Sequence, residues 1–92
     1  MKAHAKFVEN FIAARHALEM SQKHIAGRMR YRMTGWNTQS VTNFEAGRRP
    51  VTLTESEELA SLVCVPLDRM LTESASTVAR IARLNMKTGA VR

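Results

Sequence analysis

Apolar residues recur along this chain at the three- and four-residue spacing of amphipathic helices, and no segment shows the alternation typical of a strand. The pattern begins in Met1–Glu19, which contains no Gly or Pro. The apolar face of that segment consists of Phe7, Val8, Phe11, Ile12 and Leu18. We therefore predict an all-α fold.

Two shorter helices are predicted next. Ser21 is a favourable N-cap for the first of them. Its inward residues are expected to be Ile25, Ala26 and Met29. The second helix is expected to start at Asn37 or Thr38 and to stop at Gly47, a residue suited to the left-handed position that follows a helix.

The second of these helices has an unusual outer face. Val41 and Phe44 lie three positions apart and share an inward face. The side chains left outside are short, polar and uncharged: Thr38, Gln39, Thr42 and Asn43. Such a face suits a helix that lies in a DNA groove and reads base edges.

The helical pattern is lost between Arg30 and Asn37. Thr34 and Gly35 indicate a turn there. Trp36, the single tryptophan of the chain, is predicted to be a core residue beneath that turn.

Three further helical segments are predicted after Gly47. Thr54 followed by Glu57 has the spacing of a capping box and predicts a helix start. Pro66 is suited to the first position of a helix over Pro66–Leu71. A sixth helix over Ser74–Met86 is expected to dock on the domain or on a second copy of it, and Lys87–Arg92 are expected to be frayed.

The net charge of +6 is unevenly distributed. Residues 1–50 carry nine Lys and Arg against three Glu, a net +6. Residues 51–73 carry one Arg against five acids, a net −4, and residues 74–92 carry four cations and no acid. The first segment has the electrostatic footprint of a surface for a polyanion. We divide the chain into a domain over residues 1–73 and a basic, partly helical tail over residues 74–92.

Several classes of function are disfavoured. The single cysteine, Cys64, permits neither an internal disulfide nor a CxxC metal motif. No apolar run is long enough to span a membrane, and Met1–Ala14 does not resemble a signal peptide. The residues His4, His16 and His24 lack metal-ligand spacing, and no catalytic pair of carboxylates is evident. We expect a cytoplasmic, nucleoid-associated protein that is not an enzyme and needs no cofactor or metal.

The residues from Val8 to Leu71 resemble the phage-repressor/Cro-type helix-turn-helix DNA-binding domains. The segments that carry the resemblance are Ile12–Arg15, Met20–Gln22, Ile25–Ala26, Val41–Gly47 and the run from Glu58 through Pro66 to Leu71. Several separated pieces in the right order make the resemblance fairly specific. It implies a lambda-repressor-like five-helix bundle whose second and third helices form the motif, with the third in the major groove.

The resemblance also implies which residues read DNA bases. Thr38, Gln39 and Asn43 fall at the positions that reach base edges, and Thr42 is a nearby candidate. The amides of Gln39 and Asn43 have the chemistry for bidentate pairing with adenine.

Contacts to the DNA backbone are expected beside these residues, and Gln22 resembles the glutamine with which the family grips a phosphate. The expected backbone contacts are Ser21, Gln22, Lys23, Arg28, Arg30, Arg32, Ser40, Arg48 and Arg49. Arg15 and Glu45 are implied to form a partly buried ion pair between the first and third helices.

One departure from the family pattern lies between the two motif helices. Ala26 and Val41 are fifteen positions apart, five more than in the usual motif, and Arg30 stands where the turn glycine is usual. We expect the added residues, roughly Tyr31–Trp36, to lengthen the second helix or to bulge the turn, and to bring Arg30 and Arg32 towards the DNA backbone.

Two functions remain open from the sequence. The first is a sequence-specific transcriptional regulator, a phage or bacterial repressor of Cro-like type that binds a palindromic operator in double-stranded DNA as a homodimer. The alternative is an antitoxin-type or protein-interaction module in which DNA binding is secondary. For that alternative, Val78 and Ile81 are the expected contact face for a protein partner.

Overall fold

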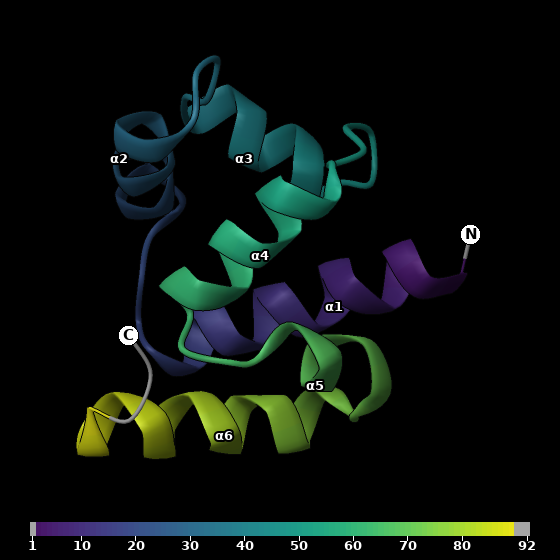
Figure 1. Ribbon diagram of the computed structural model, residues 1–92, viewed down its shortest axis with the longest axis vertical. Helices are drawn as coiled ribbons and strands as arrows, with labels where there is room; N and C mark the ends of the chain where they lie inside the picture. The colour runs from purple at the N-terminus through teal and green to yellow at the C-terminus, as the bar shows by residue number, and fades with distance from the viewer. Residues whose placement is uncertain (1, 90–92) are drawn as a thin grey trace.

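The computed structural model describes residues 2–89, and every regular element in that range is a helix (Figure 1). The helices are α1 (Lys2–Ala17), α2 (Gln22–Arg32), α3 (Thr38–Glu45), α4 (Leu53–Leu62), α5 (Leu67–Thr72) and α6 (Ala75–Thr88). The all-α prediction is confirmed. None of the helices in the described range is long and apolar enough to cross a membrane.

The expected starts of α2 and α3 are confirmed. Ser21 Oγ accepts a hydrogen bond from the backbone N–H of His24 at 2.9 Å. Asn37 Oδ1 accepts one from the backbone N–H of Ser40, also at 2.9 Å. Gly47 follows α3 with a φ of +79°, as expected of a helix-ending glycine. These caps satisfy backbone donors that a helix end would otherwise leave unpaired.

The cap of α4 lies two residues earlier than predicted. Thr52 Oγ1 accepts a hydrogen bond from the Glu55 N–H at 3.1 Å, and the Thr52 N–H donates to Glu55 Oε1 at 2.9 Å. The predicted box at Thr54 and Glu57 is therefore wrong. Pro66 is the N-cap of α5 and not, as predicted, its first helical residue.

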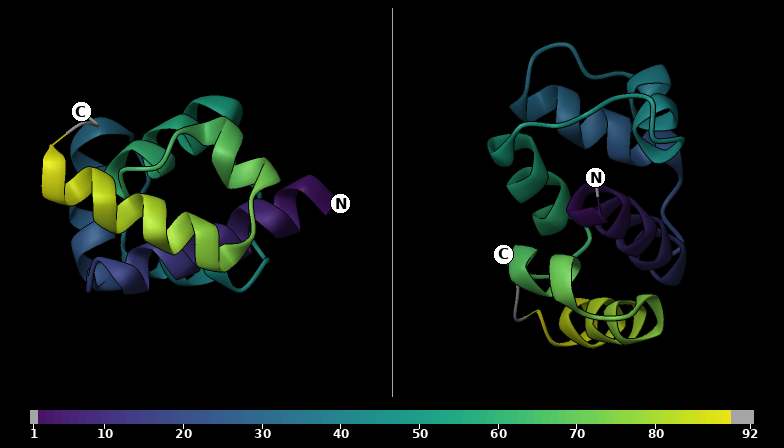
Figure 2. Two further views of the ribbon diagram at one scale, coloured as in Figure 1. Left: turned by 90° about the horizontal axis from the view of Figure 1, so that it is seen from below. Right: turned by 90° about the vertical axis from the view of Figure 1, so that its right-hand side faces the viewer.

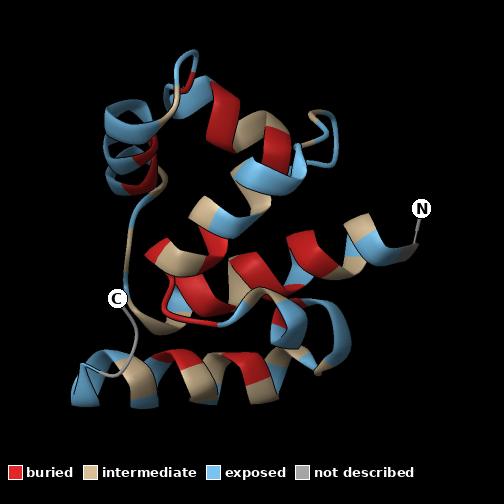
Figure 3. Cartoon of the chain, viewed as in Figure 1, coloured by how far each residue is buried: buried red, intermediate tan, exposed pale blue. Residues whose placement is uncertain are grey.

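Phe44 of α3 is the centre of an aromatic cluster in the core. Its ring centroid lies 5.8 Å from that of Phe7, 5.3 Å from that of Phe11 and 6.4 Å from that of Trp36. All four residues are buried, in the interior that Figure 3 colours red. The cluster fixes α3 against α1, and it confirms the prediction that Trp36 is a core residue.

The sixth helix is confirmed and packs along α1, at the opposite end of the molecule from α2 and α3 (Figures 1 and 2). Val78 and Ala82 are fully buried there. Asn85 Nδ2 donates a hydrogen bond to the Cys64 carbonyl at 2.9 Å. The expectation that Val78 faces a protein partner is wrong, because α1 already covers that side chain, and Ile81 packs against the same core.

The described part of the tail is more regular than expected. α6 continues through Lys87 and Thr88, and Gly89 follows it in the left-handed region with a φ of +70°. The expected fraying is therefore wrong for Lys87 and Thr88, and residues 90–92 lie outside the described residues.

Asn10 connects α1 to the end of α5. Its Nδ2 donates to the Met70 carbonyl at 2.8 Å and to the Glu73 carbonyl at 2.9 Å. Carbonyls at the end of a helix have no donor within the helix, so the buried Asn10 amide supplies the hydrogen-bond donors for the end of α5.

Candidate nucleic-acid interface

α3 has one buried face and one open face. Val41 and Phe44 are fully buried. On the other side, Thr38 and Gln39 are exposed and Asn43 is half-buried. Because the apolar side of α3 is packed into the core, the side chains on its open face are held in a fixed direction. Such a fixed direction is needed for specific contacts with a binding partner.

Ser40 belongs to the framework of α3 and not to its open face. It is buried, the Asn37 N–H donates to its Oγ at 3.1 Å, and its hydroxyl lies 3.2 Å from the Gly35 carbonyl oxygen. Ser40 was expected to contact the DNA backbone. The structure instead turns its hydroxyl into the capping box that starts α3.

Two amides of the open face are joined to each other. Gln39 Nε2 donates to Asn43 Oδ1 at 3.2 Å, one helical turn away. Arg48 Nη2 donates to the same oxygen at 3.2 Å. The Asn43 amide nitrogen and the Gln39 amide oxygen remain available, so the pair presents one donor group and one acceptor outward.

Arg15, Gln22, Thr42 and Glu45 form one network, which connects α1, α2 and α3. Arg15 binds Glu45 in a bidentate manner, with Nε 2.6 Å from Oε2 and Nη2 2.8 Å from Oε1. Gln22 Nε2 donates to Glu45 Oε1 at 2.9 Å, and the Thr42 hydroxyl donates to Gln22 Oε1 at 2.8 Å. Gln22 therefore keeps one free amide hydrogen, and the Thr42 hydroxyl is engaged within the protein.

The segment that was expected to lengthen the second helix or to bulge the turn, roughly Tyr31–Trp36, does both in part: α2 continues to Arg32, and a turn then leads to Asn37. Tyr31 is 92% exposed, because on a helix with Ile25 and Met29 inward its position is on the opposite side. The extension therefore adds a large aromatic side chain to the surface.

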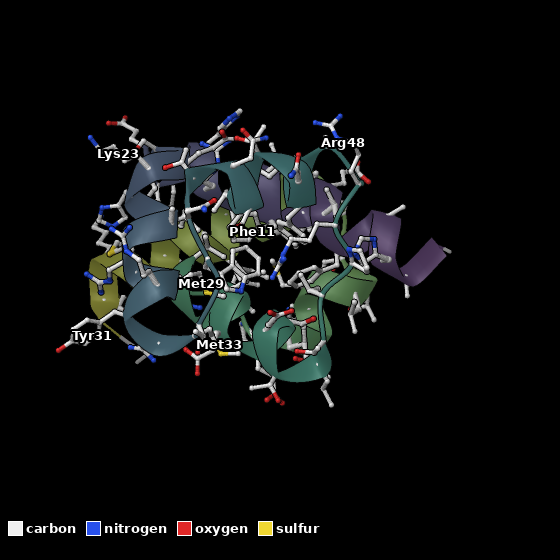
Figure 4. The ribbon with its side chains drawn as sticks, turned by 90° about the horizontal axis from the view of Figure 1, so that it is seen from above. Phe11, Lys23, Met29, Tyr31, Met33 and Arg48 are labelled. Carbon is white, nitrogen blue, oxygen red and sulfur yellow. The ribbon has the colours of Figure 1, made fainter. Side chains whose placement is uncertain are left out.

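The two ends of α2 lie differently with respect to the loop after α3. In Figure 4, Lys23 and Arg48 lie along the upper edge, whereas Tyr31 lies at the lower left, away from that edge. The start of α2 thus shares an edge with the loop that follows α3, whereas the extension of α2 does not.

The expected phosphate contacts of α2 fall at its two ends. Ser21, Gln22 and Lys23 are at its start, and Arg28, Arg30 and Arg32 follow in its second half. Arg32 Nη1 lies 2.9 Å from Glu58 Oε1 of α4, so this guanidinium already has an anionic partner. Arg28 and Arg30 are exposed.

Trp36, Arg49 and Glu55 form a second cluster, beneath the turn. The Arg49 guanidinium carbon lies 4.4 Å from the centroid of the Trp36 ring, and Trp36 Nε1 donates to Glu55 Oε2 at 3.0 Å. Arg49 Nη2 lies 3.3 Å from the same carboxylate oxygen. Arg49 is thereby drawn inward, unlike the exposed Arg48, although both were expected to contact DNA.

The same cluster changes the pKa of Glu55. Burial raises this pKa, but hydrogen bonds from the Thr52 backbone and the Trp36 ring, together with the charge of Arg49, outweigh burial and hold it below the ordinary value. Sequence reasoning missed this role of Glu55. The available signal was a second Thr-x-x-Glu match, Thr52 to Glu55, two residues before the one chosen.

The chemistry of this surface is that of uncharged amides and hydroxyls with cations beside them. Cys64 is buried, and burial raises the pKa of its thiol, so it is a poor nucleophile. Within residues 2–89, no group of three or more His, Cys, Asp and Glu side chains is placed to hold a metal ion.

Comparison with protein-family models, with curated proteins and with solved structures finds no match to this chain.

Proposed function

We propose that this protein is a sequence-specific DNA-binding regulator of transcription, a phage or bacterial repressor of Cro-like type, and that α2 and α3 form its helix-turn-helix. α3 reads base edges in the major groove. The protein binds a palindromic operator as a homodimer, because a single reading helix contacts few base pairs.

The observation that carries this proposal is the open face of α3. Gln39 and Asn43 lie one turn apart on that face and are joined by a hydrogen bond of 3.2 Å. Asn and Gln amides are the side chains that pair in a bidentate manner with adenine. Val41 and Phe44 bury the other side of the helix, so the two amides are held by a rigid element.

The flanking groups support the same proposal. Lys23 at the start of α2 and Arg48 after α3 lie along one edge of the molecule (Figure 4). The first turn of α2 adds unpaired backbone N–H groups and the free amide hydrogen of Gln22, which suits a phosphate. Phosphate contacts on both sides of a reading helix set its position on the duplex.

Selection of bound duplexes from a random pool tests the proposal directly. Enrichment of a palindrome is the expected result. On the enriched duplex, Gln39→Ala and Asn43→Ala should each lose about 1–3 kcal/mol, roughly 5- to 150-fold in Kd, with no loss on random duplexes.

Thr54→Ala is the matched control for these variants. Thr54 is an exposed polar residue of α4 and is not part of the open face of α3, so its replacement should leave both affinities unchanged. Equal losses of Gln39→Ala on enriched and random duplexes would show that α3 does not read sequence.

The alternative, an antitoxin-type or protein-interaction module, is favoured by one other observation. An open hollow of about 290 Å³ lies between α1, α4 and α5. Its apolar lining includes Phe7, Val51, Leu53, Leu67 and Leu71. Leu53 is 69% exposed and Leu71 40%, and both line this one hollow, so it presents apolar surface to solvent. Failure to enrich any duplex would favour this alternative.

A further inference from the structure

The outer face of α6 carries three cations in one line. Arg80, Arg83 and Lys87 are all exposed. At 3.6 residues per turn their directions fall within about 60° of one another around the helix. Val78 and Ala82, which are buried against α1, lie on the opposite side of the same helix. The line is therefore the part of α6 that faces most directly away from the protein.

No acidic group of the described chain neutralises this line. α6 contains no Asp or Glu. The ion pairs found within residues 2–89 are Arg15–Glu45, Arg32–Glu58, Arg49–Glu55 and Arg69–Glu73. None of them involves Arg80, Arg83 or Lys87, so three positive charges stand together without counter-charges.

The line lies at the far end of the molecule from the open face of α3. Figure 1 has its longest axis vertical, with α2 and α3 at the top and α6 at the bottom, and the right-hand view of Figure 2 agrees. The molecule extends 31 Å along that axis. Duplex DNA is stiff over about 150 base pairs, so a duplex on α3 does not bend round to reach α6. A partner of this line would therefore be separate from a duplex on α3.

We propose that α6 binds the phosphate backbone of a second DNA segment, without reading its sequence, while α3 holds the operator. This inference rests on the proposed function, which supplies the first segment. Arg80 and Lys87 are about 10 Å apart along the helix axis, the length of about three base-pair steps. Each phosphate that a cation neutralises releases counterions, and this release drives binding that is independent of sequence.

The arrangement of α6 favours DNA over a protein or a membrane. Leu84 and Met86 are 59% and 47% exposed and flank the line on its two sides. A protein interface has the reverse order, with an apolar centre and a polar rim. The apolar face of α6, which a membrane-surface helix would insert, is already buried on α1.

A capture experiment tests this second contact. The enriched duplex is fixed to beads and loaded with the full chain, and a labelled random-sequence duplex is then added at low salt. The wild type should retain the label. Arg80→Gln/Arg83→Gln should keep the protein on the beads and lower the retained label about tenfold, with the log–log salt slope reduced by about 1.8. The control variant Lys6→Gln/Arg69→Gln loses the same net charge. It should stay on the beads and retain as much label as the wild type.

The outcomes separate the two proposals. A wild type that stays on the beads without retaining label, or an Arg80→Gln/Arg83→Gln variant that retains as much label as wild type, would overturn the α6 contact. Binding of polyglutamate through α6, without binding of the duplex, would make the partner an acidic protein instead. If selection enriches no duplex, the proposed function fails at that earlier step. Direct titration of the labelled duplex against wild type and variant then decides the α6 contact alone.

Discussion

Arg15 and Glu45 are thirty residues apart in the sequence and form a bidentate ion pair, with Nε 2.6 Å from Oε2. Their side chains are only 10% and 7% exposed. Gln22 and the Met20 carbonyl complete the hydrogen bonding of the two charges, at 2.9 Å each. The pair joins α1 to the last residue of α3, so it fixes the C-terminal end of the helix that we propose reads DNA.

Removal of one member of this pair should cost more than removal of both. Glu45→Ala strands the Arg15 guanidinium in a nearly dry site and should lower the free energy of unfolding by about 3–5 kcal/mol. Arg15→Met/Glu45→Leu leaves no stranded charge and should lose much less. Urea unfolding of the single and double variants, followed by circular dichroism, measures the difference. A double variant as unstable as the single one would contradict this account.

Glu55 should make stability depend on pH in the acid range. Its pKa in the folded protein lies below the ordinary value of 4.5, so the unfolded chain binds protons more readily. The contribution of Glu55 is fully present above about pH 4.5 and is lost as pH falls through the folded pKa. In Glu55→Gln, the free energy of unfolding should vary less with pH below 4.5 than in wild type. Urea midpoints at a series of pH values provide the measurement, and equal slopes would contradict it.

Arg48 and Arg49 should behave differently, although they are neighbours. Arg48 is exposed beside Asn43, so Arg48→Gln should weaken binding to all duplexes alike and reduce the log–log salt slope by about 0.9. Arg49 lies over Trp36, so Arg49→Gln should mainly lower the free energy of unfolding, by about 0.5–2 kcal/mol. Titrations at several salt concentrations, together with urea midpoints, test both expectations. Equal salt slopes for the two variants would oppose the inward placement of Arg49.

The docking of α6 predicts that replacement by Thr lowers the free energy of unfolding by different amounts at two apolar positions. Val78 is fully buried, so Val78→Thr places a hydroxyl without a partner in the core and should cost about 1–3 kcal/mol of folding free energy. Ile81 is partly exposed, and Ile81→Thr should cost less. Both losses should be independent of protein concentration, because α6 packs on its own chain. Losses that vanish at high concentration would indicate docking on a second copy instead.

Much of the fold followed from local sequence, because a cap depends on residues close together. Ser21 was predicted as an N-cap, and the start of α3 was placed at Asn37 or Thr38; at Ser21 and at Asn37 the side chain accepts from a backbone N–H three residues on. The start of α4 was misplaced because Thr52–Glu55 and Thr54–Glu57 fit the same rule, and local sequence does not choose between them. In the fold, Glu55 also accepts a hydrogen bond from Trp36 and pairs with Arg49, two contacts that the local rule does not contain.

The candidate site was harder to foresee where tertiary contacts decide direction. Tyr31 and Trp36 are both aromatic residues of the segment between Arg30 and Asn37, yet one is 92% exposed and the other 2%. The inward placement of Arg49 depends on Trp36 and Glu55, which lie on either side of it in the sequence and meet only in the fold. The sequence also did not decide what covers Val78, because an apolar helix face can pack on its own domain or on a second copy equally well.

The burial of Trp36 has a practical consequence. It is the single tryptophan of the chain. Its ring centroid lies 6.4 Å from that of Phe44, and its Nε1 donates to Glu55 in the first turn of α4. Its fluorescence therefore reports on this one contact region between α3 and α4, whereas circular dichroism reports on all the helices together. If this region opens before the rest of the molecule, the fluorescence transition will precede the loss of helix. The protein thus carries an internal probe for local opening next to α3, and no added label is needed.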